Sequence, residues 1–127
     1  MRAVVIHAPK DLRIDNFTDP APGASQVRVK IAAGGICGSD LHYYRHGGFG
    51  TVRIQQPMVL GHEISGVIAA VGSDVSHLEP GMRVAVNPSQ PCGVCIHCRE
   101  GMRNQCLDMR FMGSAMRMPH RAIAKFW

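Results

Sequence analysis

Hydrophobic and polar residues alternate over short stretches of this chain, and glycines and prolines separate the stretches. Residues 26–31 alternate without interruption (Gln-Val-Arg-Val-Lys-Ile), which indicates a strand with one face buried and the other exposed to solvent. Apolar and often β-branched residues mark further strands at 2–6, 12–17, 59–71 and 82–86. Gly61 and Gly66 interrupt the longest of these stretches, so we expect it to form bent strands.

The connections between these strands are short and contain little helix. A turn at residues 9–11 is predicted to join the first two strands. Ser39 and Asp40 can cap a short helix that continues over 42–45, and glycines within 47–50 would end it. The pattern predicts a mainly β, antiparallel domain, a partly closed barrel with short helices.

The composition is that of a folded protein of one domain. The chain has 127 residues, of which 46% are hydrophobic and 18% charged, which excludes an intrinsically disordered chain. It has no apolar run long enough to span a membrane and no signal peptide, so we expect a cytoplasmic protein with reduced thiols and no membrane partner. The net charge of +5 is spread singly rather than in a basic run, so we expect no nucleic-acid partner.

Four of the five cysteines fall within one short segment. Cys92, Cys95 and Cys98 are separated by two residues each, and Cys106 follows after seven more. Cysteines at this spacing can bend a backbone turn around one ion, and four thiolates form a closed tetrahedral set that is typical of structural zinc. We therefore expect a zinc-braced lobe at residues 88–110.

Three other interpretations of this segment are weaker. A disulfide framework is disfavoured by the odd number of cysteines and by the lack of an export signal. An iron–sulfur ferredoxin would place its fourth cysteine three residues after Cys98 and follow it with proline, whereas Cys106 comes after seven residues and precedes Leu107. A nucleic-acid-binding zinc ribbon would be expected to carry clustered basic residues, which this chain lacks.

The fifth cysteine, Cys37, lies 25 residues before the adjacent pair His62 and Glu63. A thiolate, an imidazole and a carboxylate give three protein ligands, and three ligands with an open fourth position define a catalytic zinc site. The same residues also fit a hydrogen-bonded core histidine and a small buried cysteine. On the residues alone, both interpretations stay open.

Several of these segments together resemble the medium-chain zinc-dependent alcohol and polyol dehydrogenases. Residues 61–72 resemble the zinc signature of that family, and residues 37–44 resemble the segment that carries its first catalytic ligand. Residues 80–84 are similar to its Pro-Gly-Asp-Arg-Val strand, with Met82 in place of the aspartate. The cysteine cluster is similar in order and spacing to its structural-zinc lobe. Within the family, residues 37–44 resemble the sorbitol dehydrogenase branch, and residues 109–116 most resemble the L-idonate dehydrogenases.

The resemblance implies a GroES-like fold for residues 1–120 and two zinc sites. The structural site would use Cys92, Cys95, Cys98 and Cys106. The catalytic zinc would be held by Cys37, His62 and Glu63, the last as a ligand or as a close neighbour of one.

The resemblance also implies the chemistry of alcohol oxidation. Ser39 would relay the proton of the substrate hydroxyl and His42 would pass it to solvent, while Tyr43 and Phe49 would line the pocket for a polyol or sugar acid. Zinc would lower the pKa of the alcohol, and hydride would pass to NAD or NADP.

The chain departs from this family in two respects. It has no Gly-x-Gly-x-x-Gly motif and no βαβ unit after the cysteine cluster, so a Rossmann domain is absent. Residues 121–127 also diverge from the family pattern, which indicates a truncation near His120. We therefore expect the isolated chain to be inactive. The resemblance also implies that full-length relatives form oligomers, and it leaves the oligomeric state of this chain open. The alternative function is that of a non-catalytic zinc-binding module.

Overall fold

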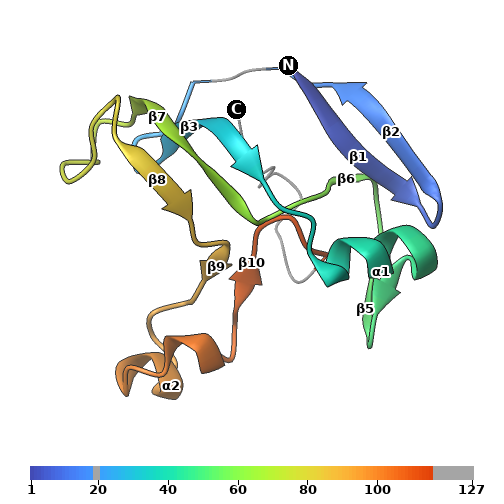
Figure 1. Cartoon of the computed structure of the whole chain (residues 1–127). Helices are drawn as coiled ribbons and strands as arrows, with labels where there is room; N and C mark the ends of the chain where they lie inside the picture. The colour runs from blue at the N-terminus through green and yellow to red at the C-terminus, as the bar shows by residue number, and fades with distance from the viewer. Residues whose placement is uncertain (19–20, 116–127) are drawn as a thin grey trace.

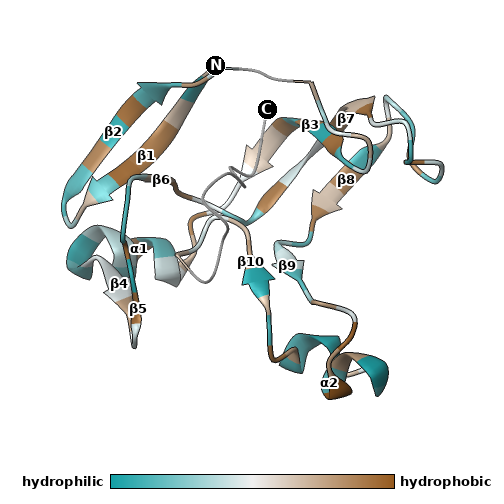
Figure 2. Ribbon diagram, turned by 180° about the vertical axis from the view of Figure 1, so that it is seen from behind, coloured by the Kyte–Doolittle hydropathy of each residue, from teal (hydrophilic) through white to brown (hydrophobic). Residues whose placement is uncertain are grey.

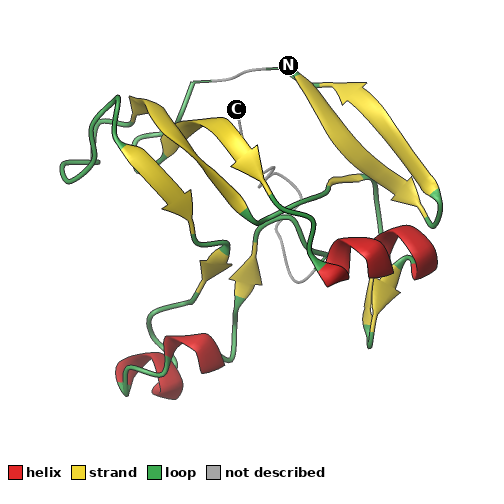
Figure 3. Ribbon diagram, viewed as in Figure 1, coloured by secondary structure: helices red, strands yellow, loops and turns green. Residues whose placement is uncertain are grey.

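The computed structural model describes residues 1–18 and 21–115 and is built mainly from strands (Figure 1). The predicted divergent tail at 121–127 lies outside the described residues. Figure 3 shows that, within the described chain, the helical segments are confined to α1 (Gly38–His46) and to the cysteine lobe. The prediction of a mainly β domain is confirmed.

An antiparallel hairpin forms the first sheet. Strand β1 (Arg2–Ala8) pairs with β2 (Asp11–Asn16), and β6 (Met58–Val59) pairs with the other edge of β1. Lys10 adopts a left-handed conformation with φ of 62°, which confirms the predicted turn. Val5 and Ile6 on β1 are almost completely buried, so both faces of this strand contribute to the core.

The second sheet has the order β3 (Val27–Gly34), β7 (Ile64–Val71) and β8 (Arg83–Val86), with all pairs antiparallel. Val29 and Ile68 bury their side chains in the core. A Cβ atom at Gly66 would collide with the carbonyl of Lys30 on the neighbouring strand, so only glycine permits this close pairing. The apolar stretch that was predicted to bend is divided between β6 and β7.

Helix α1 begins earlier than the sequence pattern predicts. Cys37 is its N-cap residue, and the carboxylate of Asp40 reaches back to accept the Cys37 N–H at 2.9 Å. Gly47, with φ of 72°, ends the helix and leads into a small hairpin of β4 (Gly48–Phe49) and β5 (Val52–Arg53). The predicted cap at Ser39 was therefore wrong by two residues.

The cysteine lobe extends from the second sheet. Strands β9 (Ser89–Gln90) and β10 (Arg110–Phe111) pair at its base, and the helical segments α2 (Ile96–Arg99) and η1 (Arg103–Gln105) lie between them. The lobe lies away from the two larger sheets in Figure 1. The cysteine spacing does not predict these helical turns.

The described strands form four separate hydrogen-bonded sheets and do not close into a barrel. In Figure 2, apolar and polar residues alternate over the first part of β3, as the sequence pattern over 26–31 indicated. Within residues 1–18 and 21–115, no helix combines the length and the apolar character that crossing a membrane requires.

Candidate metal centres

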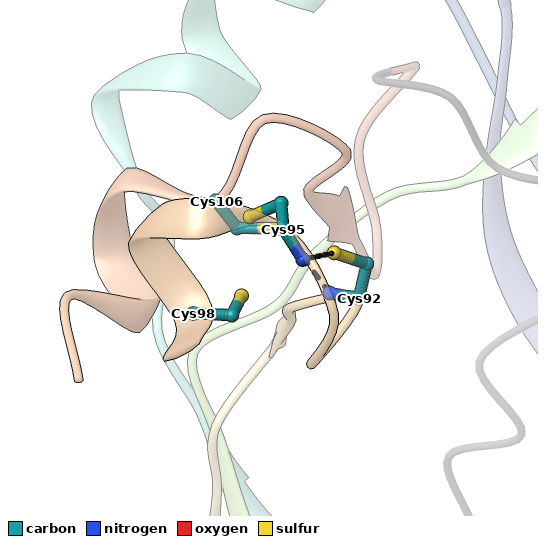
Figure 4. A group of neighbouring side chains, drawn as sticks. All are labelled: Cys92, Cys95, Cys98 and Cys106. Atoms are coloured by element: carbon teal, nitrogen blue, oxygen red, sulfur yellow. Dashed lines mark hydrogen bonds between the residues drawn. The ribbon is translucent and has the colours of Figure 1, made fainter. Parts of the chain in front are cut away.

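The four clustered cysteines converge in the lobe. The sulfurs of Cys92, Cys95, Cys98 and Cys106 all lie within 4.8 Å of one another (Figure 4). The backbone N–H of Cys92 donates to the sulfur of Cys106 at 3.1 Å, and the N–H of Cys95 donates to the sulfur of Cys92 at 3.4 Å. Backbone donors aimed at sulfur stabilise the thiolate form, the form that binds metal.

The ionisation of these thiols differs from one cysteine to the next. Backbone N–H groups of Leu107 and Cys98 lower the pKa of Cys95 to about 6, and those of Val94 and Cys95 lower the pKa of Cys92. Burial raises the pKa of Cys98 to about 12. A bound divalent cation would offset the energetic cost of ionising the buried thiol of Cys98. A group of four sulfur ligands fits zinc.

Cys37, His62 and Glu63 form a second group, with one ligand atom from each lying within 4.8 Å of the others. The antiparallel pairing of β3 with β7 brings them together, since the end of β3 lies beside the start of β7. The Gly35 N–H donates to the Glu63 carbonyl at 2.7 Å and continues this pairing beyond the strands. A Cβ atom at Gly35 would stand 2.5 Å from Oε2 of Glu63, so glycine provides the space for this carboxylate.

Asp40 joins this second group, a contact that the sequence analysis missed. Oδ1 of Asp40 lies 3.8 Å from Nδ1 of His62, and both atoms are buried without a hydrogen-bond partner among residues 1–18 and 21–115. The other carboxylate oxygen holds the backbone of Cys37. Because Nδ1 of His62 faces Asp40, Nε2 is the nitrogen left for an ion. The facing atoms of Asp40 and His62 are consistent with a cation bound at Nε2 of His62. Such a cation would make Nδ1–H of His62 a stronger hydrogen-bond donor to Asp40.

The segment that follows the lobe packs on the same site. The ring of Phe111 meets the His62 ring edge-on, with centroids 5.2 Å apart. Gly113 has φ of 68°, and a Cβ atom there would collide with the carbonyl of Gly61. No spacing rule in the sequence indicates these contacts, because more than forty residues separate the two segments.

The residues expected to relay a proton both lie on α1. Ser39 is half-buried in the first turn, two residues after Cys37, and His42 is exposed one turn later. Residues three apart on a helix share a face, so the two side chains can be neighbours. Their role as a relay stays a prediction.

The residues expected to line a substrate pocket lie deeper than anticipated. Tyr43 is 0% exposed, and its hydroxyl lies 2.8 Å from Oγ of Ser114 and accepts the N–H of Ala115, also at 2.8 Å. Phe49 packs edge-on against the Tyr43 ring at 5.5 Å. Both residues are thus part of the packing around α1, and a contact with substrate stays a prediction.

The fold and the two ligand groups define a β domain that can hold one metal ion in a closed cysteine set and another in an open, mixed set. Residues 23–125 match the family "Alcohol dehydrogenase GroES-like domain". The chain therefore belongs to this family, which confirms the resemblance found in the sequence.

Three relatives illustrate the similarity. L-idonate 5-dehydrogenase (NAD(P)(+)) of Escherichia coli is 58% identical over 92 residues, which cover 72% of this chain and 26% of the relative. Sorbitol dehydrogenase of Bacillus subtilis is 44% identical over 114 residues, which cover 90% of this chain and 32% of the relative. The crystal structure of L-idonate 5-dehydrogenase from E. coli superposes with a TM-score of 0.78 at 45% identity, covering 94% of this chain and 34% of that one. The chain thus spans about a quarter to a third of these relatives.

Proposed function

We propose that this chain is the catalytic-metal domain of an NAD(P)-dependent dehydrogenase that oxidises a polyol or a sugar acid, with L-idonate the favoured substrate. The observation that carries this proposal is the convergence of Cys37, His62 and Glu63 from distant segments beside the buried carboxylate of Asp40. Three mixed ligands leave a coordination position for substrate, unlike the closed cysteine group.

The residues of the chain divide the work of alcohol oxidation. Zinc, when held by Cys37, His62 and Glu63, supplies a Lewis acid that lowers the pKa of a substrate hydroxyl. Asp40 fixes the orientation of the His62 ring through Nδ1. The hydroxyl of Ser39 can accept the proton released by substrate and donate its own to His42, which is exposed to water.

Several further assignments belong to this proposal. Residues 1–120 form one domain, and residues 88–110 form a lobe that holds structural zinc through Cys92, Cys95, Cys98 and Cys106. NAD or NADP would act as the hydride acceptor, an assignment supported by the name of the E. coli relative. A reducing compartment, the cytoplasm, suits five cysteines that form no disulfide.

The cysteine lobe favours a second candidate function, a zinc-binding module without catalysis. The lobe carries its own backbone donors to sulfur. A chain with only this site formed would bind one zinc ion and catalyse nothing.

A chimera separates these two functions. In this chimera, residues 1–115 of the chain replace the segment of E. coli L-idonate 5-dehydrogenase that aligns with them. The reduction of NAD(P)⁺ is then followed with L-idonate and with sorbitol as substrates. We expect turnover that Cys37→Ser abolishes and that His77→Gln, a change at an exposed histidine, leaves intact. A folded chimera that holds two zinc ions and shows no turnover contradicts the proposal.

A further inference from the structure

The segment that leaves the cysteine lobe makes direct contact with His62, a candidate metal ligand. Strand β10 pairs with β9 at the base of the lobe and leads from there towards the two larger sheets (Figure 1). The N–H of Met112 donates to the carbonyl of Pro88 at 3.0 Å and extends this pairing. Phe111, within β10, packs edge-on against the His62 ring, with the rings inclined by 74°. A strand of the lobe thus contacts the second ligand group.

The same segment then anchors on α1. Oγ of Ser114 lies 2.8 Å from the hydroxyl of Tyr43, and this hydroxyl accepts the N–H of Ala115 at 2.8 Å. Tyr43 is 0% exposed and Ser114 is 8% exposed. A hydrogen bond in such a buried place is strengthened by the low dielectric and is costly to leave unmade. These contacts therefore fix α1 relative to the strand that comes from the lobe.

The two anchors lie on the two segments that supply the second ligand group. On α1, Tyr43 and Asp40 are three residues apart and both are buried, so they share the inner face of the helix. Asp40 accepts the N–H of Cys37 and faces Nδ1 of His62 at 3.8 Å. Phe111 contacts the His62 ring itself. A shift of β10 would therefore disturb a ligand on each segment.

We propose that these contacts couple the metal ion in the lobe to the metal ion beside His62. The inference rests on the proposed function, because it requires both groups to hold metal. An ion in the lobe orders β10, and the ordered strand holds α1 and the His62 ring in the arrangement that the second ion needs. Phe111, Ser114 and Tyr43 are thus positioning residues, which act through His62 and Cys37.

The test measures, on the full chain without a tag, how tightly the ion beside His62 is bound when the lobe is loaded and when Cys95→Ser has emptied it. Co²⁺ is the probe ion, because its visible absorption distinguishes a site with one sulfur ligand from a sulfur-rich site. A bridge variant, Tyr43→Phe with Phe111→Leu, removes the hydroxyl and the ring that make the contacts. Tyr44→Phe is the matched control, since it removes a hydroxyl from the next residue of α1, which is 41% exposed.

We expect the empty lobe to weaken Co²⁺ binding beside His62 by about fivefold or more. In the bridge variant, emptying the lobe should weaken it by about twofold or less, because the coupling contacts are already lost. The Tyr44→Phe control should keep the full effect. A general loss of stability would instead give the same factor in all three backgrounds.

Coupling between two sites is reciprocal, so each ion must strengthen the binding of the other by the same factor. Cys37→Ser should therefore weaken zinc binding in the lobe as much as the empty lobe weakens Co²⁺ binding. This second measurement decides the question even if Cys95→Ser fails to fold.

Equal Co²⁺ affinity with loaded and empty lobes, or a lobe zinc unaffected by Cys37→Ser, overturns the coupling and leaves the proposed function intact. An undiminished effect in the bridge variant overturns the assignment of Tyr43 and Phe111 as positioning residues. Native mass spectrometry before the titration counts the metal ions, and a wild-type chain that holds only one ion overturns both the coupling and the proposed function.

Discussion

Gly35→Ala is the change that most selectively tests the role of Glu63. The new Cβ atom would stand 2.5 Å from Oε2 of Glu63, which is too close, and 3.1 Å from Cβ of Glu63, a tight contact that a shift of a few tenths of an ångström relieves. The atom that must move is the end of a flexible side chain rather than backbone. We therefore expect the carboxylate to rotate away from Cys37 and His62 while the backbone pairing of Gly35 with Glu63 persists.

The two contributions to folding stability nearly cancel. Replacing glycine by alanine stabilises by about 0.4–1 kcal/mol through the unfolded chain, and an off-rotamer Glu63 costs about 0.5–1.5 kcal/mol. The unfolding free energy should thus change by less than about 1 kcal/mol. Loss of one ligand should weaken the second zinc at least tenfold, which corresponds to about 1.4 kcal/mol.

A chelator competition followed by metal analysis measures the affinity of each zinc, and thermal unfolding measures stability. Gly38→Ala is the matched control. Apart from its chain neighbours and the backbone of its own helix, no atom of the described residues lies within 4 Å of its Cβ position, so this variant should keep both zinc ions. If Gly35→Ala binds its second zinc as tightly as the wild type does, Glu63 is not a ligand and the reasoning fails.

The remaining predictions concern the lobe and the packing of α1. Cys95→Ser should release the structural zinc and unfold the lobe, since metal binding and folding are coupled there; an unchanged circular dichroism spectrum would refute this. Tyr43→Phe should destabilise the chain by about 1–3 kcal/mol in urea unfolding, because Ser114 and the N–H of Ala115 lose a buried partner; an unchanged midpoint would show that this contact contributes nothing.

The strands could be predicted because their pattern is local. The alternation over 26–31 describes β3, although pairing with β7 extends that strand to Gly34. The start of α1 was misplaced because Ser39 has the better N-cap propensity. Asp40 instead satisfies the N–H of Cys37 from inside the helix and fixes the start there.

The two ligand groups differ in how far the sequence indicates them. The spacing of Cys92, Cys95 and Cys98 is a local signal, and the structure brings these sulfurs together with that of Cys106. The grouping of Cys37 with His62 depends on the pairing of β3 with β7, so the residues alone left it open and only the family resemblance pointed to it.

The contacts from the segment after the lobe had no signal in the sequence. Phe111 on His62 and Ser114 on Tyr43 join parts of the chain that are far apart in sequence, and no periodicity or spacing links them. These contacts form because the chain, after leaving the lobe, passes beside His62 and α1.

The most direct test of the central claim is the number of zinc ions per chain, measured by native mass spectrometry on protein purified without added metal. We expect two zinc ions in the wild type and one in Cys37→Ser. One zinc ion in both proteins would mean that the group of Cys37, His62 and Glu63 does not hold metal and that the chain is a zinc-binding module. Iron, or no metal at all, would contradict the assignment of both centres.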